Sequence, residues 1–278
     1  MTISVHTNSS ALAALQQLNK TNSSLDDAQT RINTGLKVSG AKDNAAVFAI
    51  AQNLRADIGA YGAVKTSLDR AASIGNVALA AGQSISDLLI ELRAKATAAT
   101  DTSIDTFTRK AFDSDFKSII SQISTILANA AFDGANILDS SNSPGIDFLS
   151  DADGVNTLTL KTQNMSFGGS IITLSSSASL GTVTLAKAAV TAVKTSLENV
   201  NQSLANLGSD VKKIEAHSIF VNKLTDSLNV GVGNLVDADL AVESAKLQAL
   251  QVQQQLGVQA LGIANSRPQI ILSLFRGR

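Results

Sequence analysis

Residues 11–36, ALAALQQLNKTNSSLDDAQTRINTGL, decide the fold of this chain. Apolar side chains recur in this stretch at intervals of three or four residues, a spacing that places them along one side of an α-helix. The polar Asn22 falls within this seam, where it can fix the register of a helix pair at some cost in stability. The seam comprises Ala11, Leu15, Leu18, Asn22, Leu25, Ala28, Ile32 and Leu36.

The other end of the chain carries two apolar stripes on one predicted helix, and such a helix contacts neighbours on two sides. Residues 247–266 contain no charge, and six glutamines supply the polarity. Glutamine forms hydrogen bonds without the desolvation cost of a charge, which suits a surface that is wet before assembly and dry afterwards. One stripe is Val242, Ala245, Ala249, Val252, Leu256 and Ile263, and the second is Leu247, Leu250, Val258 and Leu261.

Two interpretations fit these terminal helices. They are either ordinary core helices of one bundle or packing surfaces between copies of the chain. The uncharged C-terminal stretch favours contacts between copies. The predicted subunit-interface residues are Leu15, Leu18, Leu25, Ile32, Leu247, Leu250, Val252, Leu256, Leu261, Ile263, Leu272, Leu274 and Phe275.

Composition narrows the class of protein. The 278 residues include no cysteine and two prolines, which excludes disulfides and permits very long helices. A net charge of −1 without a basic patch argues against a nucleic-acid partner. We expect no cleaved signal peptide, because the first residues are polar, and no membrane insertion, because no apolar run reaches spanning length.

Helical spacing dominates the rest of the chain. Residues 44–100 indicate one long helix or two abutting helices, and a break at residues 100–105 precedes another helix. A further helix is expected from about Leu185 to Asn229, ended by Gly231 and Gly233.

Between these helices, residues 132–184 are rich in Gly, Ser, Thr and Asn. Residues 146–149 and 155–161 alternate around Asp153-Gly154, which predicts a β-hairpin, and residues 171–174 suggest another strand. The predicted fold class is therefore mainly α: long antiparallel helices in a coiled-coil-like bundle, a small β-hairpin region, and paired terminal helices.

Catalytic and metal motifs are absent from the sequence. The two histidines, His6 and His217, lack cysteine or an HExxH motif to complete a zinc site. Residues 151–154 lack the later acidic ligands of a calcium loop and indicate a turn. Residues 231–233 do not follow a strand, which argues against nucleotide binding. We therefore expect no enzyme activity and no cofactor.

Several segments resemble one family. Residues 31–38, RINTGLKV, and 41–46, AKDNAA, are similar to the N-terminal signature of bacterial flagellin. Residues 235–244, LVDADLAVES, are similar to its C-terminal signature. Shorter matches in the expected order are residues 222–224, 253–256, 263–265, 268–269 and 272–276.

The resemblance implies a structural subunit that self-polymerises into the flagellar filament for swimming. It implies an inner terminal domain of residues 1–40 and 236–278, a helical shell of residues 41–138 and 185–235, and a small exposed region at 139–184. It further implies termini that order on assembly, joined to the shell by linkers at residues 38–42 and 231–236.

The implied partners are other copies of the chain, the flagellar export apparatus, an export chaperone and the filament cap, with paralogous flagellins as further partners. The implied location is the extracellular filament. Density of serine in the central region suggests O-glycosylation at Ser141, Ser143, Ser166 and Ser170. Two alternatives remain: a hook–filament junction protein, which shares flagellin-like termini, and a flagellin-scaffold enzyme, which the small serine-rich middle disfavours.

Overall fold

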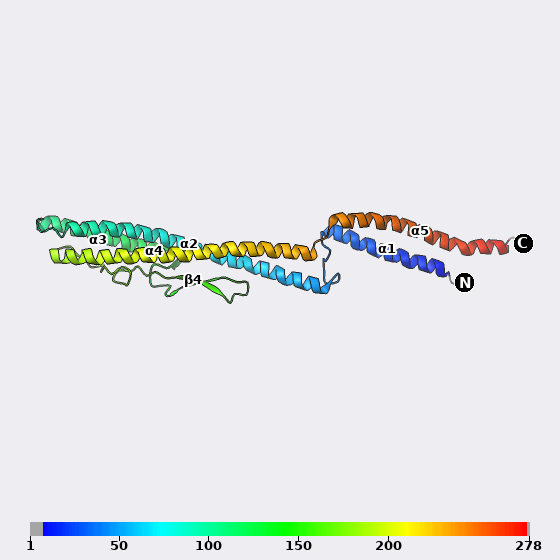
Figure 1. The fold of residues 1–278 in the computed structure, drawn as a ribbon, viewed down its shortest axis with the longest axis horizontal. Coiled ribbons are helices and arrows are strands. Elements are labelled where there is room, and N and C mark those ends of the chain that lie inside the picture. Colours follow the sequence, from blue (N-terminus) through cyan, green and yellow to red (C-terminus); the bar gives the residue numbers. More distant parts are fainter. Residues whose placement is uncertain (1–7, 277–278) are drawn as a thin grey trace. The chain divides into compact units, whose positions relative to one another are not determined.

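The computed structural model describes residues 8–276, of which 267–276 are described by their backbone alone. This part of the chain forms five helices and four short strands (Figure 1). It divides into two compact units, one of residues 57–226 and the other of the described residues before 57 and after 226. The elements are α1 (Ser9–Thr34), α2 (Ala45–Ala98), α3 (Thr106–Asn129), β1 (Ala131–Phe132), β2 (Ala135–Asn136), β3 (Gly145–Leu149), β4 (Thr157–Lys161), α4 (Val183–Val236) and α5 (Leu240–Arg276).

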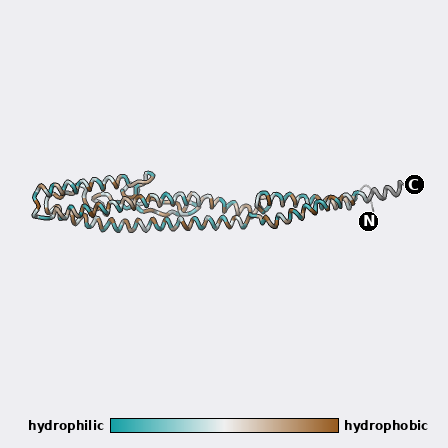
Figure 2. The backbone as a smooth tube through the Cα atoms, turned by 90° about the horizontal axis from the view of Figure 1, so that it is seen from above, coloured by the Kyte–Doolittle hydropathy of each residue, from teal (hydrophilic) through white to brown (hydrophobic). Residues whose placement is uncertain are grey.

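The mainly α fold predicted from sequence is confirmed. α2 is a single unbroken helix, and the break at residues 100–105 separates it from α3. Asp105 caps α3, its side chain accepting a hydrogen bond from Thr108 N at 2.7 Å. Along the tube of Figure 2, hydrophobic and hydrophilic residues alternate through the long helices, as expected for helices that bury one face.

The core of the 57–226 unit is built from the apolar faces of α2, α3 and α4, with the β region packed against them. Its small and branched side chains fit closely spaced helices, and Phe116 is the largest side chain that is fully buried. The fully buried residues also include Leu68, Ile85, Leu89, Leu92, Ile123, Leu138 and Leu160.

Two glycines on α2 allow a close approach of α4. A Cβ built on Gly75 would lie 2.4 Å from Val211 Cγ2, and one on Gly82 would lie 2.5 Å from Leu204 Cδ2. The sequence number rises along α2 as it falls along α4, so the helices are antiparallel. Glycine at these positions is thus required by packing, despite a cost to helix propensity of about 1 kcal/mol relative to alanine.

A carboxylate on α3 holds the segment that leads into α4. Asp113 Oδ1 accepts hydrogen bonds from Ser179 Oγ at 2.8 Å and Leu180 N at 2.6 Å, and Lys117 Nζ lies 2.7 Å from Oδ2. Burial raises the pKa of this carboxyl, but the hydrogen bonds from Lys117, Leu180 and Ser179 outweigh it and leave the pKa below its usual value. Asp113 therefore ties two segments far apart in sequence.

The β region consists of two antiparallel pairs. β3 pairs with β4 in the register Gly145↔Lys161 to Leu149↔Thr157, which confirms the predicted hairpin. The hairpin is anchored to the helices, because Leu149 N donates to Ser67 Oγ at 3.1 Å and His217 Nε2 lies 2.8 Å from Ser150 O.

The second pair, β1 with β2, was not predicted. Asp133 and Gly134 connect these strands with φ values of 51° and 74°. Positive φ at both central residues is the requirement of a type I′ turn, and Asp-Gly is a preferred dipeptide for it.

Two predictions about the elements were wrong. Residues 171–174 form no strand, and Ile172 makes only an isolated bridge with Phe167. α4 continues through Gly231 and Gly233 to Val236, since neighbouring helical hydrogen bonds compensate for a modest glycine penalty. The chain leaves the helix at residues 237–239, where the Asp239 side chain accepts hydrogen bonds from Ala241 N at 2.9 Å and Val242 N at 3.1 Å and starts α5.

Gly75→Ala should lower the free energy of unfolding by about 1–2 kcal/mol, because overpacking against the stiff Val211 side chain exceeds the gain in helix propensity. Gly208→Ala is the matched control: it lies in α4 with no atom within 4 Å of an added Cβ. It should stabilise by about 0.5–1 kcal/mol. Denaturant unfolding of the monomeric chains measures both, and equal stabilisation by the two substitutions would contradict the close approach.

Candidate self-assembly interface

The terminal helices α1 and α5 pack side by side in antiparallel orientation within their unit, as Figure 1 shows. Asn8 caps α1, because its side chain accepts a hydrogen bond from Ala11 N at 3.1 Å. Gly35 ends the helix with a φ of 71°, in the left-handed conformation that glycine adopts without strain. The predicted pairing of the chain's two ends is therefore present within one copy.

The apolar centre of the pair is short. Leu25, Ala28 and Leu250 are buried together, and Leu247 packs against them. Buried and half-buried positions on α5 alternate at intervals of three and four residues, the spacing of a coiled-coil seam. They are Glu243, Leu247, Leu250, Gln254, Gly257, Leu261 and Ala264.

Polar and small residues fill the seam toward the chain ends. Gln254 Nε2 donates to Asn22 Oδ1 at 2.8 Å, and Asn8 Nδ2 donates to Ala264 O at 2.8 Å. Between them, Leu18 lies over Gly257, where an added Cβ would be 3.2 Å from Leu18 Cδ1. An amide pair among leucines favours one register, because a shifted register would leave these half-buried amides unpaired.

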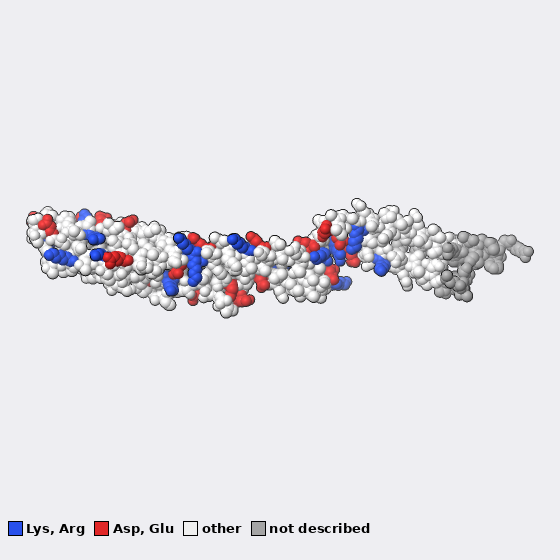
Figure 3. All heavy atoms as spheres, viewed as in Figure 1, with Lys and Arg blue, Asp and Glu red and all other residues white. Residues whose placement is uncertain are grey.

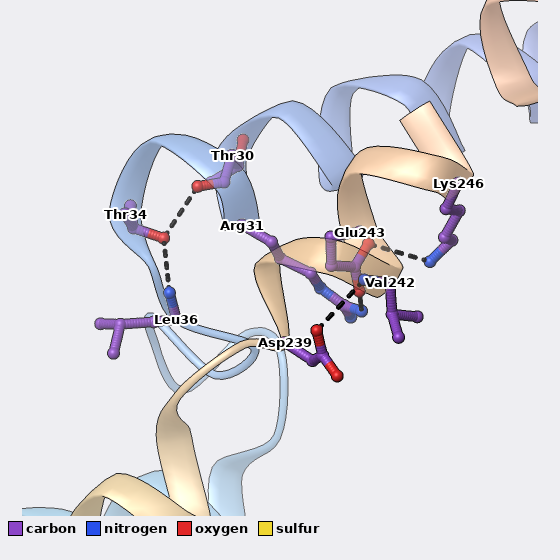
Figure 4. Close-up of polar contacts among 8 residues, drawn as sticks. All are labelled: Thr30, Arg31, Thr34, Leu36, Asp239, Val242, Glu243 and Lys246. Carbon is purple, nitrogen blue, oxygen red and sulfur yellow. Dashed lines mark hydrogen bonds and ion pairs between the residues drawn. The ribbon is translucent and has the colours of Figure 1, made fainter. Parts of the chain in front are cut away.

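An ion pair closes the other end of the helix pair (Figure 4). Arg31 Nη1 lies 3.0 Å from Glu243 Oε1, and Lys246 Nζ lies 3.5 Å from Oε2. The hydrogen bond from Arg31, opposed by burial and assisted by the charge of Lys246, holds the pKa of Glu243 below its usual value of 4.5. Because Glu243 is only 8% exposed, it depends on these two cations.

Short backbone contacts join α1 to the end of α4. Leu36 and Asp237 form an antiparallel bridge, Lys37 N donates to Val236 O at 2.7 Å, and Ala238 N donates to Gly35 O at 2.8 Å. Lys37 Nζ also donates to Asn234 O at 2.9 Å, at the carbonyl end of α4 where a cation is favourable. The residues of both sequence signatures thus form one junction.

The predicted interface residues whose side chains are described separate into three groups. Leu25 and Leu250 are buried in the seam, while Leu18, Ile32, Leu247 and Leu261 are half-buried. Four remain exposed: Leu15 at 42%, Val252 at 55%, Leu256 at 58% and Ile263 at 63%. The side chains of Leu272, Leu274 and Phe275 lie outside the described residues.

Leu15 was expected in the seam but lies outside it. Ala14 is half-buried in its place. The burial pattern on α1 follows positions 14, 18, 21, 25 and 28, which excludes position 15. α5 carries an exposed apolar stripe of its own, which we call the outer stripe: Val242, Val252, Leu256 and Ile263.

Charge is distributed unevenly on these helices. On the face of Figure 3, charged side chains of α1 and α5 gather toward the junction, and the surface beyond is uncharged up to the grey atoms. Residues 247–266 of α5 carry no charged side chain. The outer stripe is consequently a neutral surface over most of its length, and its burial incurs no charge desolvation.

The sequence analysis predicted neither the Arg31–Glu243 ion pair nor the close contact of Leu18 with Gly257. The sequence did contain one signal for the ion pair. The N-terminal signature includes Arg31 and the C-terminal signature includes Glu243, and each lies near the end of a predicted helix. No comparable signal marked Gly257, because its role depends on which residue of α1 lies opposite.

Comparison with known proteins identifies the family. The bacterial flagellin N-terminal helical region matches residues 5–143, and the bacterial flagellin C-terminal helical region matches residues 190–275. Flagellin FljJ of Caulobacter vibrioides is 47% identical over 284 residues, covering 100% of each chain. Flagellin FljM of the same organism is 48% identical over 273 residues, covering 98% of each chain. A flagellin of Brucella melitensis is 39% identical over 291 residues, covering 99% of each chain.

The helical architecture and these matches define a structural subunit of the flagellar filament. The chain belongs to the bacterial flagellin family, which confirms the resemblance drawn from its signatures. No comparison favours the hook–filament junction protein. Within residues 8–276, no helix has the length and hydrophobicity needed to cross a bilayer.

Glu243→Gln should weaken the α1–α5 pair at neutral pH and have little effect in acid. A carboxyl whose pKa is lowered by pairing stabilises the paired state above its unpaired pKa, and this contribution is lost as the pH falls through the lowered value. Thermal melting of assembled protein from pH 7 to pH 2 measures the difference between variant and wild type.

Glu198→Gln is the control, since Glu198 is 66% exposed in a 3.9 Å pair with Lys194. Its difference from wild type should stay small throughout. A Glu243→Gln difference that does not shrink in acid would refute the role of the charge.

Proposed function

We propose that this chain polymerises by burying the exposed apolar residues of α1 and α5 against the terminal helices of other copies. The observation that carries the proposal is an inversion of side-chain size. Ala11, Ala14 and Gly257 face the seam near the chain ends, whereas Val252 and Leu256 remain outside it. A helix pair folding only for itself would bury its largest apolar side chains.

This inversion explains why the pair needs further copies. Among the described residues, its buried apolar cluster comprises Leu25, Ala28 and Leu250, with Leu247 packed against them. A short apolar centre offsets little of the conformational entropy lost when two long helices become ordered. Burial of the outer stripe between copies supplies the missing contribution, so ordering of the termini accompanies assembly.

Within this proposal, the interface residues divide by role. Leu18, Leu25, Ile32, Leu247, Leu250 and Leu261 align α1 with α5 inside one copy. Leu15, Val252, Leu256 and Ile263 contact neighbouring copies. Leu272, Leu274 and Phe275 extend the second group by sequence pattern.

The sequence divisions remain our proposal for the filament. Residues 1–40 and 236–278 form its inner tube, residues 41–138 and 185–235 its shell, and residues 139–184 its small outer surface. The filament is extracellular, and the chain reaches it through the flagellar export apparatus with an export chaperone and adds beneath the filament cap. It requires no cofactor and acts as a structural protein.

Co-assembly with related subunits is part of the proposal. Five of the similar proteins are flagellins of Caulobacter vibrioides, so one organism holds several such chains. Subunits that share the same seam and outer stripe can occupy equivalent positions in one filament.

The central serines remain candidates for O-glycosylation. Ser141, Ser143 and Ser170 are exposed, whereas Ser166 is half-buried. The Ser141 hydroxyl donates to Asp139, which leaves Ser143 and Ser170 as the better acceptors. Intact mass of the natural filament protein tests the proposal, since a mass equal to that of the sequence would refute modification.

Leu256→Gln should raise the critical concentration for polymerisation by about 10-fold or more, because burial of one leucine contributes about 1.5–3 kcal/mol. The substitution leaves helix propensity almost unchanged. Sedimentation of filaments from residual monomer after seeding measures it.

Gln255→Ala is the adjacent control, on a different face of α5, and should polymerise like the wild type. If wild-type protein polymerises and Leu256→Gln matches it, the outer stripe is not the interface. If seeded wild-type protein yields no filaments, the polymerisation proposal itself is wrong.

A further inference from the structure

Two Asp-Gly dipeptides lie in turns of the β region. Asp133-Gly134 joins β1 to β2, and Asp153-Gly154 lies between β3 and β4. An aspartyl side chain that precedes glycine can react with its own main chain, because glycine has no Cβ to keep its amide nitrogen away from the aspartyl carboxyl carbon. Both dipeptides are exposed to water, and the two glycines have positive φ values of 74° and 69°. The two sites therefore differ in how firmly they are held rather than in their access to solvent.

The first dipeptide is held by the strands and by an ion pair. β1 and β2 pair directly on either side of it, in the register Phe132↔Ala135, so the turn consists of Asp133 and Gly134 alone. Arg70 Nη2 on α2 lies 2.9 Å from Asp133 Oδ2 and directs the carboxylate toward that helix. Reaction requires the carboxyl carbon to swing over the Gly134 nitrogen, and this motion breaks the ion pair.

The Asp153 carboxyl has no such restraint. It forms no hydrogen bond or ion pair within the described part of the chain. The Gly154 nitrogen, the atom that attacks this carboxyl, donates to Asp151 O at 3.4 Å. A hydrogen bond of this length is weak, so neither the side chain nor the amide nitrogen is firmly held away from the other.

The ends of the loop that contains Asp153 are fixed. Asp151 Oδ1 accepts a hydrogen bond from Val155 N at 3.1 Å, and Asp151 Oδ2 accepts one from Asn156 N at 3.1 Å. Ser150 N donates to Asn156 O at 3.1 Å and extends the pairing of β3 with β4. Rotation about the Asp153-Gly154 peptide therefore disrupts no strand pairing.

We propose that Asp153 is a site of spontaneous isomerisation to isoaspartate in the folded protein. The Gly154 nitrogen attacks Asp153 Cγ, and the new C–N bond closes a succinimide ring while the carboxyl hydroxyl and the amide hydrogen leave as water. A water molecule then opens the ring. Cleavage of the new bond restores aspartate, whereas cleavage of the original peptide bond gives isoaspartate, in which the main chain runs through Cβ and Cγ.

The product has the same mass as the original chain but one more atom in its backbone at residue 153. The Asp151 hydrogen bonds to Val155 and Asn156 span this point, so isomerisation alters the shape of the exposed loop and leaves the β3–β4 pairs in place. The modification is independent of polymerisation, since every group that it uses belongs to one copy.

Storage of the full chain at neutral pH and body temperature for several weeks tests the proposal. Chymotryptic peptides separate the two dipeptides, because Phe148 lies between them, and electron-transfer fragmentation distinguishes isoaspartate from aspartate in each peptide. Isoaspartate at residue 153 should exceed that at residue 133 by about 10-fold, which corresponds to a barrier difference of about 1.4 kcal/mol. In the chain unfolded by denaturant, the two sites should react at similar rates.

Two variants serve as controls. Asp153→Glu keeps the charge but must close a larger ring, so it should remove the signal at residue 153 and leave residue 133 unchanged. Arg70→Gln releases the Asp133 carboxylate and should raise isoaspartate at residue 133 several-fold without affecting residue 153.

Three results would count against this inference. Absence of isoaspartate at residue 153 in the folded chain, or equal amounts at residues 133 and 153, would overturn the proposal. An Arg70→Gln chain without a rise at residue 133 would overturn the protective role given to the ion pair.

Discussion

The packing of α1 against α5 is the interaction on which this subunit depends, because it decides which apolar side chains are satisfied inside one copy. The pair buries a leucine cluster near the junction, and Arg31 with Glu243 closes that end. Toward the chain ends, amides, alanine and glycine join the half-buried Leu18 and Leu261 in the seam. The large apolar side chains left outside form the surface that we propose for contact with other copies, since apolar burial is the main favourable contribution to association.

The 57–226 unit has the same helical periodicity as the α1–α5 pair but a much larger apolar core. Its helices share an extensive apolar core, and Gly75 and Gly82 let α4 approach α2 closely. Asp113, Ser67 and His217 then fix the loops and the hairpin to the helices. A unit held in this way keeps its surface features at constant separation, which a repeating contact between copies requires.

Much of the fold was predictable because its signals are local. Heptad spacing indicated α1 and α5, and Asp153-Gly154 marked the turn between β3 and β4. Gly231 and Gly233 were misread because local propensity does not include the helix on either side. Residues 171–174 have strand composition, yet no second strand lies beside them for a full ladder. At the interface, the leucines were predictable by period, but their division into buried and exposed groups was not.

The sequence by itself determined the mainly helical class, the pairing of the chain ends and the flagellin family, because periodicity and signature motifs depend on residues that are close together in the sequence. Only the tertiary structure decided that Leu250 faces α1 while Leu256 faces away, that Gln254 meets Asn22, and that Glu243 meets Arg31. Each of these depends on the register of two helices more than 200 residues apart in sequence. Register is set by the sum of many weak contacts across the seam, so it becomes definite only when both helices are in place.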